Sequence, residues 1–247
     1  MRGPPTPASP LRTERLNRLT KALAEQGVVR LRDAAALLDV SEMTVRRDIA
    51  ANAGQFAFFG GHILRAGDFG GNAGYRIDRE QDKFAAAKAA ACAKAANLIA
   101  ERDTVFIDCG TTTPYLANLI PTNLSVTVVC YALNIAQIVS RKPEVRMILL
   151  GGAYHPSSAT FSGGEGLEAL SAIGVNKAFI SAGGVERARG VSCWNFHEVP
   201  IKQKAMSCAV ERHLVVDSSK IGKVTAAFFA KIDDFDSIIT ELPGVDP

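Results

Sequence analysis

Long apolar runs and paired cysteines, the usual marks of membrane and secreted proteins, are missing from this sequence of 247 residues. No uninterrupted apolar stretch reaches the ~18 residues of a membrane-spanning helix, and the longest candidate, residues 85–100, contains Lys88 and Lys94. The five cysteines form no CxxC pair, and no cysteine–histidine cluster has the spacing of a zinc site. Residues 1–10 include four prolines and lack the apolar core of a secretory signal. We therefore expect a cytoplasmic protein with free thiols that associates with no membrane.

Motifs of hydrolases and nucleotide-binding enzymes are missing as well. The sequence has neither the GxSxG elbow of serine hydrolases nor a P-loop, and its four histidines are scattered. Glu198 and Lys202, four residues apart, could form a catalytic pair, but an i,i+4 ion pair on a helix surface is the simpler interpretation. We therefore expect no enzymatic activity, no metal site and no cofactor.

The sequence does contain enough apolar material for a core, and its charge is unevenly distributed. Hydrophobic residues make up 47% and charged residues 21%, which excludes wholesale disorder. The net charge of +3 is concentrated at the start of the chain, because residues 1–50 hold nine basic and six acidic residues, whereas the remainder holds nineteen of each. We therefore expect any nucleic-acid interface to lie in this part of the chain.

Two short helices joined by a tight turn are predicted in residues 31–50. Residues 31–38 form the first helix, and the hydroxyl of Ser41 can cap the second. In a helix-turn-helix, the second helix enters the major groove of DNA and turns the side chains of its N-terminal half toward the bases. The expected DNA contacts are Ser41, Met43, Thr44, Arg46 and Arg47. The alternative is an ordinary helical hairpin with a solvated basic face.

Elements on either side complete a small DNA-binding domain. A helix that begins at about residue 11 carries leucines at three- and four-residue steps. Gly60 and Gly61 lie between two apolar pairs and predict a hairpin wing. The expected organisation is a disordered leader at 1–10, a winged helix-turn-helix domain at 11–64, a linker at 65–80 and a second domain at 81–247.

Short apolar strands alternate with helices in the second domain. The expected strands are 105–108, 126–130, 146–150, 177–181, 213–217 and 237–240. The expected helices between them are 84–100, 114–120, 133–140, 165–173 and 200–209. This alternation predicts an α/β fold with a mainly parallel sheet that is covered on both faces.

Small and polar residues follow several of these strands. After the strand that ends at Asp108, the chain turns through Gly110 and starts a helix, for which Thr113 is the expected N-cap and Pro114 the first helical residue. Free amides and hydroxyls at such a helix start can bind a phosphate. In open α/β sheets, ligands bind outside the carboxyl ends of the strands. The alternative is that these residues serve only as helix caps and tight turns.

The motifs, in their order along the chain, resemble those of the DeoR family of transcriptional repressors. Residues 33–48 look like the family's helix-turn-helix, and the segments that resemble its sensor domain are 106–114, 129–134, 150–152 and 215–224. The resemblance implies a repressor of deoxyribonucleoside or sugar catabolism genes. Its C-terminal domain would have a ribose-5-phosphate isomerase-like fold that binds a ligand without converting it. The implied partners are double-stranded operator DNA, a phosphosugar effector, with deoxyribose 5-phosphate as the first choice, and further copies of the chain, because paired half-sites require at least a dimer.

The resemblance also assigns roles to individual residues. The family's phosphate loop corresponds to Asp108, Gly110, Thr111 and Thr112, and further effector-binding positions correspond to Asn134, Gly151, Gly152, Glu198, Lys202 and Lys220. Asp39 stands where the family usually has glycine, and we expect it to adopt the left-handed conformation with some strain. Two alternatives remain open: a DeoR-type regulator of another sugar phosphate, and a sugar-phosphate isomerase with a DNA-binding leader.

Overall fold

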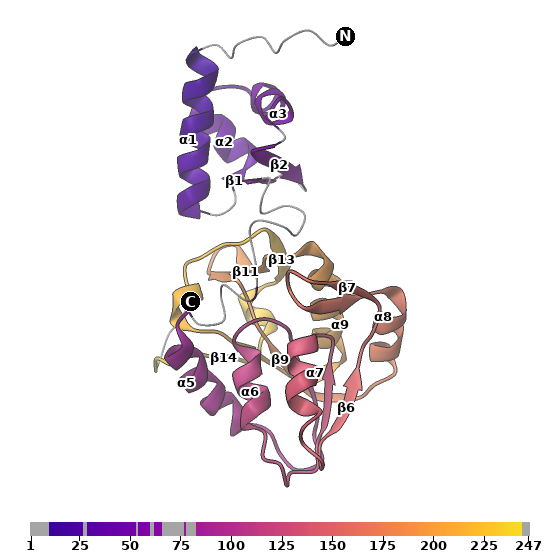
Figure 1. Ribbon diagram of the computed structural model, residues 1–247. Helices are drawn as coiled ribbons and strands as arrows, with labels where there is room; N and C mark the ends of the chain where they lie inside the picture. Colours follow the sequence, from indigo (N-terminus) through magenta and orange to yellow (C-terminus); the bar gives the residue numbers. More distant parts are fainter. Residues whose placement is uncertain are drawn as a thin grey trace. The chain divides into compact units, whose positions relative to one another are not determined.

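A computed structural model describes residues 10–26, 29–52, 54–59, 62–65, 77 and 83–243 (Figure 1). The chain divides into two compact units, Met1–Gly74 and Tyr75–Pro247. The leader expected at 1–10 lies outside the described residues except for Pro10, and most of the linker expected at 65–80 lies outside them too.

The N-terminal unit combines three helices with a small antiparallel sheet. Its elements are α1 (Pro10–Gln26), β1 (Val29–Arg30), α2 (Leu31–Leu38), α3 (Glu42–Ala50), β2 (Phe56–Phe59) and β3 (His62–Arg65). The strand order is β1-β3-β2. The two helices predicted in residues 31–50 are confirmed. Strands β2 and β3 pair as the predicted hairpin requires, while its turn residues Gly60 and Gly61 lie outside the described part.

The spacing of apolar residues explains how the three helices pack. Leu19 and Leu23 of α1 lie on one face of the helix and are buried. They belong to one core with Ala34 of α2 and with Val45 and Ile49 of α3. The small side chain of Ala34, which is fully buried, suits a position where two helices cross closely.

Two residues shape the turn between α2 and α3. Asp39 has φ 53° and ψ 49°, the left-handed conformation that was expected for it, and its amide donates to the carbonyl of Ala36. Ser41 has extended dihedrals, and its hydroxyl accepts from the amide of Thr44 at 3.2 Å. The prediction of Ser41 as the N-cap is therefore confirmed.

The C-terminal unit is built on a six-stranded parallel sheet. The sheet order is β14-β12-β9-β4-β5-β6, and every pair of neighbouring strands is parallel. The strands are β4 (Thr104–Ile107), β5 (Thr127–Cys130), β6 (Arg146–Leu149), β9 (Val175–Ile180), β12 (Ala209–Val215) and β14 (Ser237–Ile239). The α/β prediction is confirmed, although β12 begins four residues earlier than expected, because its first half, in which Val210 and Glu211 are exposed, shows no continuous apolar run.

Helices cover both faces of this sheet. They are α5 (Ala85–Ala96), α6 (Thr113–Leu119), α7 (Leu133–Val139), α8 (Gly164–Ser171) and α9 (Val199–Cys208), with short 3₁₀ turns at Phe196–Glu198, Ser218–Lys220 and Ile232–Asp234. Helices α5, α6 and α7 lie side by side on one face, and α8 and α9 pack together on the other (Figure 1). No helix among the described residues is long and apolar enough to cross a bilayer.

Two small antiparallel sheets were not expected from the sequence. One pairs β7 (Ala153–His155) with β8 (Thr160–Ser162), and the other has the order β10 (Gly184–Glu186), β11 (Gly190–Cys193), β13 (Ala227–Ala230). Strands of three or four residues are too short to show a hydrophobic period, and glycines around them had indicated only turns. Cys193 of β11 and Ser158, in the loop that joins β7 to β8, line the site described next.

Candidate functional site

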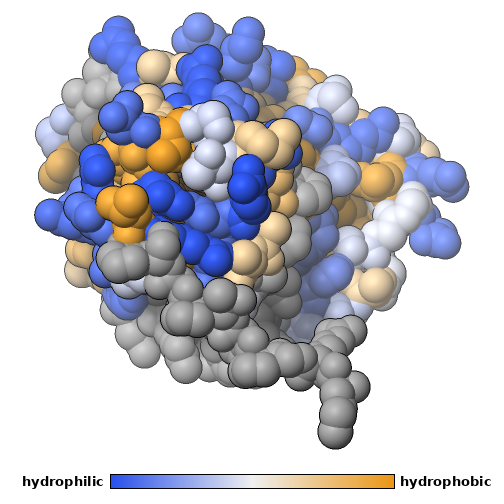
Figure 2. Space-filling view, turned by 90° about the horizontal axis from the view of Figure 1, so that it is seen from above, coloured by the Kyte–Doolittle hydropathy of each residue, from blue (hydrophilic) through white to orange (hydrophobic). Residues whose placement is uncertain are grey.

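Helix α3 presents the side chains that the sequence had assigned to DNA. Met43, Arg46 and Arg47 are exposed, and Thr44 is half-buried. Val45 of the same helix is fully buried. The helix therefore has one face in the core and one free for the major groove, as a helix-turn-helix requires. On the face of the molecule seen in Figure 2, hydrophilic side chains predominate and apolar ones form small patches between them.

A buried carboxylate that sequence reasoning missed fixes α3 against α1. Asp48 is 8% exposed, and its carboxylate is paired with Arg12 at 3.3 Å and Arg15 at 2.7 Å. The two arginines lie more than thirty residues away in the sequence, so no local pattern connects them with Asp48. The pairing holds the recognition helix in place and takes two of the arginines of α1 out of the set available to DNA.

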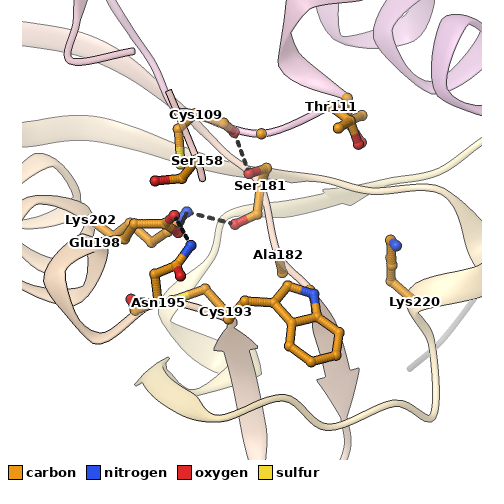
Figure 3. A pocket seen from close by; sticks show the side chains of 14 residues that line it. Cys109, Thr111, Ser158, Ser181, Ala182, Cys193, Asn195, Glu198, Lys202 and Lys220 are labelled. Carbon is orange, nitrogen blue, oxygen red and sulfur yellow. Dashed lines mark hydrogen bonds and ion pairs between the residues drawn. The ribbon is translucent and has the colours of Figure 1, made fainter. Parts of the chain in front are cut away.

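A polar cavity lies at the carboxyl ends of strands β4 and β9 and provides about 510 Å³ of space, part of it open to solvent (Figure 3). Six residues named from the sequence line it, namely Gly110, Thr111, Thr112, Glu198, Lys202 and Lys220. Glu198, Lys202 and Asn195 lie on one side of the cavity, and Thr111 and Lys220 on the other (Figure 3). The sequence had assigned no effector-binding role to the lining residues Ser158, Ser181, Cys193, Trp194 and Asn195, which stand on a small sheet or on the loops that follow strands.

Beneath the cavity, Asp108 and Lys202 form a fully buried ion pair. The ammonium of Lys202 contacts Oδ2 of Asp108, and the same oxygen accepts from the amide of Ser181 at 2.7 Å. Oδ1 accepts from the hydroxyl of Tyr131 at 2.8 Å. Asp108 is not among the lining residues. The sequence had placed it in direct contact with the effector, whereas the structure makes it the partner that orients Lys202.

Glu198 is the carboxylate in the wall of the cavity. Its Oε1 accepts from the side-chain amide of Asn195 at 2.7 Å, while the ammonium of Lys202 lies 3.9 Å from Oε2. Both side chains are almost completely buried, so the interpretation of Glu198 and Lys202 as an ion pair on a helix surface is wrong. Only the tertiary structure could show this, because the spacing of four residues is the same in both cases.

Burial and charge change the acidities in this cluster. Burial raises the pKa of Glu198 above its ordinary value, although Lys202 opposes the change. Burial is the largest single influence and acts to lower the pKa of Lys202, but attraction by Asp108 together with the other acidic groups around it raises that pKa well above its ordinary value. Burial also raises the pKa of the Cys109 and Cys193 thiols, which keeps both protonated at neutral pH.

Three other predicted effector residues lie elsewhere. Asn134 lines a neighbouring cavity between α6 and α7, which shares Gly110 and Thr111 with the first, and its amide donates to the carbonyl of Gly110 at 3.0 Å. Gly151 and Gly152 line neither cavity. Gly152 has φ +134°, and a Cβ there would stand 2.3 Å from the carbonyl oxygen of Ser162. The structure thus gives Gly152 a packing role between β7 and β8.

The start of α6 also differs from the expectation. Thr113 is the first helical residue and not the N-cap, and Pro114 follows it within the first turn. The hydroxyl of Thr113 is fully buried and donates to the carbonyl of Cys109 at 3.0 Å. Thr113 is therefore used inside the protein, and the hydroxyls that face the cavity belong to Thr111 and Thr112. Among the described residues, no cluster of histidine, cysteine and carboxylate side chains could hold a metal ion.

A winged helix-turn-helix unit joined to an α/β unit with a polar cavity at its strand ends is the architecture of two-domain transcription regulators. The family described as the DeoR C terminal sensor domain matches residues 83–242, and the DeoR-like helix-turn-helix domain matches residues 15–61. The chain therefore belongs to the DeoR family of transcriptional regulators.

Relatives of this family match almost the whole chain. The deoxyribose operon repressor of Escherichia coli K12 is 36% identical over 230 residues, which cover 93% of this chain and 90% of that protein. The lactose phosphotransferase system repressor of Streptococcus mutans is 32% identical over 238 residues, which cover 92% of this chain and 91% of that protein. Among solved structures, ribose 5 phosphate isomerase A of Neisseria gonorrhoeae is 14% identical and has a TM-score of 0.42. The matched region covers 55% of this chain and 53% of the isomerase chain.

Proposed function

We propose that this protein is a DNA-binding repressor that a phosphosugar, deoxyribose 5-phosphate, releases from its operator. The observation that carries the proposal is the polar cavity of the C-terminal unit, which has Lys220 and Thr111 on one side and Glu198 and Asn195 on the other. The cation and the hydroxyl suit a phosphate, and the carboxylate and the amide suit sugar hydroxyls. The 36% identity with the deoxyribose operon repressor supports the choice of sugar and of deoxyribonucleoside catabolism genes as targets.

Lys220 is well suited to the phosphate. Its side chain is half-buried at the edge of the cavity and has no hydrogen bond or ion pair with any described residue. An ammonium group in that position would gain a charge-assisted hydrogen bond when a phosphate binds. Lys202, in contrast, already donates to Asp108 and to the carbonyl of Ser181.

Repression would depend on several copies of the chain bound to paired half-sites. Arg46 and Arg47 of α3 would contact phosphates or guanine edges, and phosphate contacts would dominate the affinity. The effector would favour an arrangement of the oligomer that no longer matches the spacing of the half-sites. The size of that shift is limited by the difference in the effector's affinity for the two arrangements.

Two other functions stay testable. The 32% identity with the lactose phosphotransferase system repressor supports a regulator of the same kind that responds to a different sugar phosphate. A sugar-phosphate isomerase would need a base that reaches the sugar, and Asp108 is fully engaged below the cavity. Glu198 is the carboxylate that lines the cavity and would have to serve as that base.

The test is fluorescence anisotropy of the full-length protein on labelled duplexes from upstream of its own gene and of nucleoside catabolism genes. Deoxyribose 5-phosphate is titrated at fixed salt, with ribose 5-phosphate and unphosphorylated deoxyribose as controls. Release by deoxyribose 5-phosphate alone supports the proposal. If the protein binds one duplex specifically and another sugar phosphate releases it, that compound is the effector in place of deoxyribose 5-phosphate. Turnover of either pentose phosphate would favour the isomerase.

A matched pair of lysine variants tests the phosphate position. Lys220→Met should raise the half-maximal concentration of deoxyribose 5-phosphate about tenfold or more, because a charged hydrogen bond is lost. Lys223→Met removes an exposed lysine outside the cavity lining and should leave it unchanged. DNA affinity without effector should be the same in both variants. An equal response to the effector in both would remove Lys220 from the phosphate site.

A further inference from the structure

An aromatic ring of the wing lies against an arginine of the recognition helix. The guanidinium carbon of Arg46 in α3 stands 4.4 Å from the centroid of the Phe58 ring in β2. This distance is within the range of a cation–π contact. We propose that Phe58 is a positioning residue for DNA recognition, whose ring holds the Arg46 guanidinium in one orientation and presents its donors to the duplex. This inference rests on the proposed function.

The ring of Phe58 is itself held in place by the packing of the wing. Phe58 pairs with Ile63 of β3, which is fully buried, and is packed against the core of the N-terminal unit. Phe56, two residues earlier and therefore on the same face of the strand, is 2% exposed. Phe58 therefore projects from β2 on the same side as Phe56, which is anchored in the core that also contains Val45 and Ile49 of α3.

A short connection also fixes β2 relative to α3. The side-chain amide of Asn52 donates to the carbonyl of Asp48 in α3 at 2.7 Å. The carbonyl of Asn52 in turn accepts from the amide of Phe56 at 3.0 Å. The helix and the strand are therefore joined by hydrogen bonds directly at the turn, and these bonds connect the two elements that carry Arg46 and Phe58.

Stacking on a ring leaves the hydrogen-bonding capacity of an arginine intact. The five N–H groups of a guanidinium lie in its plane, so an aromatic ring can cover one face while the edges stay free. Among the described residues, none forms a hydrogen bond or an ion pair with the Arg46 side chain, and the residue is exposed. Arg46 is thus restricted in orientation and still has its donors available for a phosphate or for the edge of a guanine. Less conformational entropy is then lost when it binds.

Arg47, the next residue of the same helix, provides an internal control. It is exposed as well, and no described aromatic ring lies over its side chain. The structure therefore separates two adjacent arginines of equal charge, one supported by a ring and one not. Any effect of Phe58 on DNA binding should act through Arg46 and leave the contribution of Arg47 unchanged.

The test is a set of double-mutant cycles, with affinity measured by anisotropy at fixed salt on the labelled duplex from upstream of the protein's own gene. Phe58→Leu should weaken binding about five- to tenfold, and Phe58→Tyr, which keeps the ring, should stay within about twofold of the wild type. In an Arg46→Ala background, Phe58→Leu should have no further effect. In an Arg47→Ala background, it should have its full effect.

Equal effects of Phe58→Leu in the two arginine backgrounds would contradict the proposal. If Phe58→Leu weakens binding by the same factor in the Arg46→Ala and Arg47→Ala backgrounds, the ring only stabilises the fold and the proposal is overturned. Circular dichroism melting of each variant shows whether the N-terminal unit is folded at the assay temperature. Failure of the wild type to prefer any duplex would instead contradict the proposed function, which makes the two failures distinguishable.

Discussion

The two candidate sites of this protein, one in each unit, place their charged side chains differently. The N-terminal unit leaves Arg46 and Arg47 exposed on α3, without an acidic partner among the described residues. The C-terminal unit buries Asp108, Glu198 and Lys202 below and around a cavity. DNA is a large polyanion that must be contacted from outside, whereas a small ligand is recognised by enclosing it in a shaped site. The position of the charge therefore reflects the size of what each unit binds.

This difference has an energetic consequence. Exposed charges are hydrated whether or not the chain is folded, so their removal changes binding more than stability. Buried charges lose their hydration on folding and depend on their partners, so removal of one partner leaves the other uncompensated. The following predictions test this contrast in order of decreasing effect.

The largest effect is expected for the ion pair under the cavity. Lys202→Met should lower the free energy of unfolding of the C-terminal unit by about 3–5 kcal/mol, because it leaves Asp108 buried without a cation. Urea unfolding followed by the fluorescence of Trp194, the single tryptophan of the chain, measures this. The control is Arg212→Met, which breaks the exposed pair with Asp236 and should cost less than about 1 kcal/mol. Equal losses of unfolding free energy in the two variants would contradict the expected difference between buried and exposed charges.

The two glycines after β6 should behave differently from each other. Gly152→Ala should destabilise the C-terminal unit by about 2–3 kcal/mol, because φ is +134° and the new Cβ would meet the carbonyl of Ser162. Gly151→Ala should change stability by less than about 0.5 kcal/mol, since nothing lies within 4 Å of its Cβ position. The same unfolding assay compares them. A stable Gly152→Ala protein with a lost effector response would return Gly152 to the binding site.

A pair of stacked histidines should make the C-terminal unit sensitive to acid. The ring centroids of His155 and His197 lie 3.7 Å apart. Burial, together with the charge of His155, lowers the pKa of His197 to about 4. An unfolded chain protonates His197 below about pH 6.5, so it binds more protons than the folded chain between these values. The free energy of unfolding should fall as the pH is lowered from 7 to 4.

His197→Gln measures this contribution. We expect the fall in the free energy of unfolding between pH 7 and pH 4 to be about 1–2 kcal/mol smaller in the variant than in the wild type. The difference is no larger because His197 is partly exposed and solvent screens its charge. Urea unfolding at several pH values gives the two slopes. Identical slopes for the variant and the wild type would show that other groups, such as the buried His213, cause the acid sensitivity.

The smallest effect concerns the cap of the recognition helix. Ser41→Ala should lower the stability of the N-terminal unit by about 1 kcal/mol, because the amide of Thr44 loses the capping hydroxyl and keeps only the carbonyl of residue 41 as an acceptor. Circular dichroism melting of the variant measures the change, with Ser41→Asn as a replacement that keeps a capping oxygen. If Ser41→Ala also weakens DNA binding at temperatures where it is fully folded, Ser41 contacts the duplex in addition to capping α3.

Local sequence patterns were sufficient for much of the fold. The helices of residues 31–50 and the cap at Ser41 follow from periodicity and from the conformational preferences of single residues, while the left-handed Asp39 was expected from the resemblance to the family. The alternation of strands and helices predicted the parallel sheet, and the position of polar residues after strands predicted where the cavity would open. All of these depend on neighbours in the chain.

Contacts between distant residues were beyond such patterns. Lys202 meets Asp108 across 94 residues of sequence, and Asp48 meets Arg15 across 33. Whether Glu198 and Lys202 lie on a surface or in a wall, and which ring covers Arg46, depends on how the elements pack. By itself, the sequence determined the helices and the strands of the parallel sheet, with the chemistry available at their ends, because these depend on local propensity. The tertiary structure alone decided which charges are buried together, because burial and pairing are properties of the assembled layers.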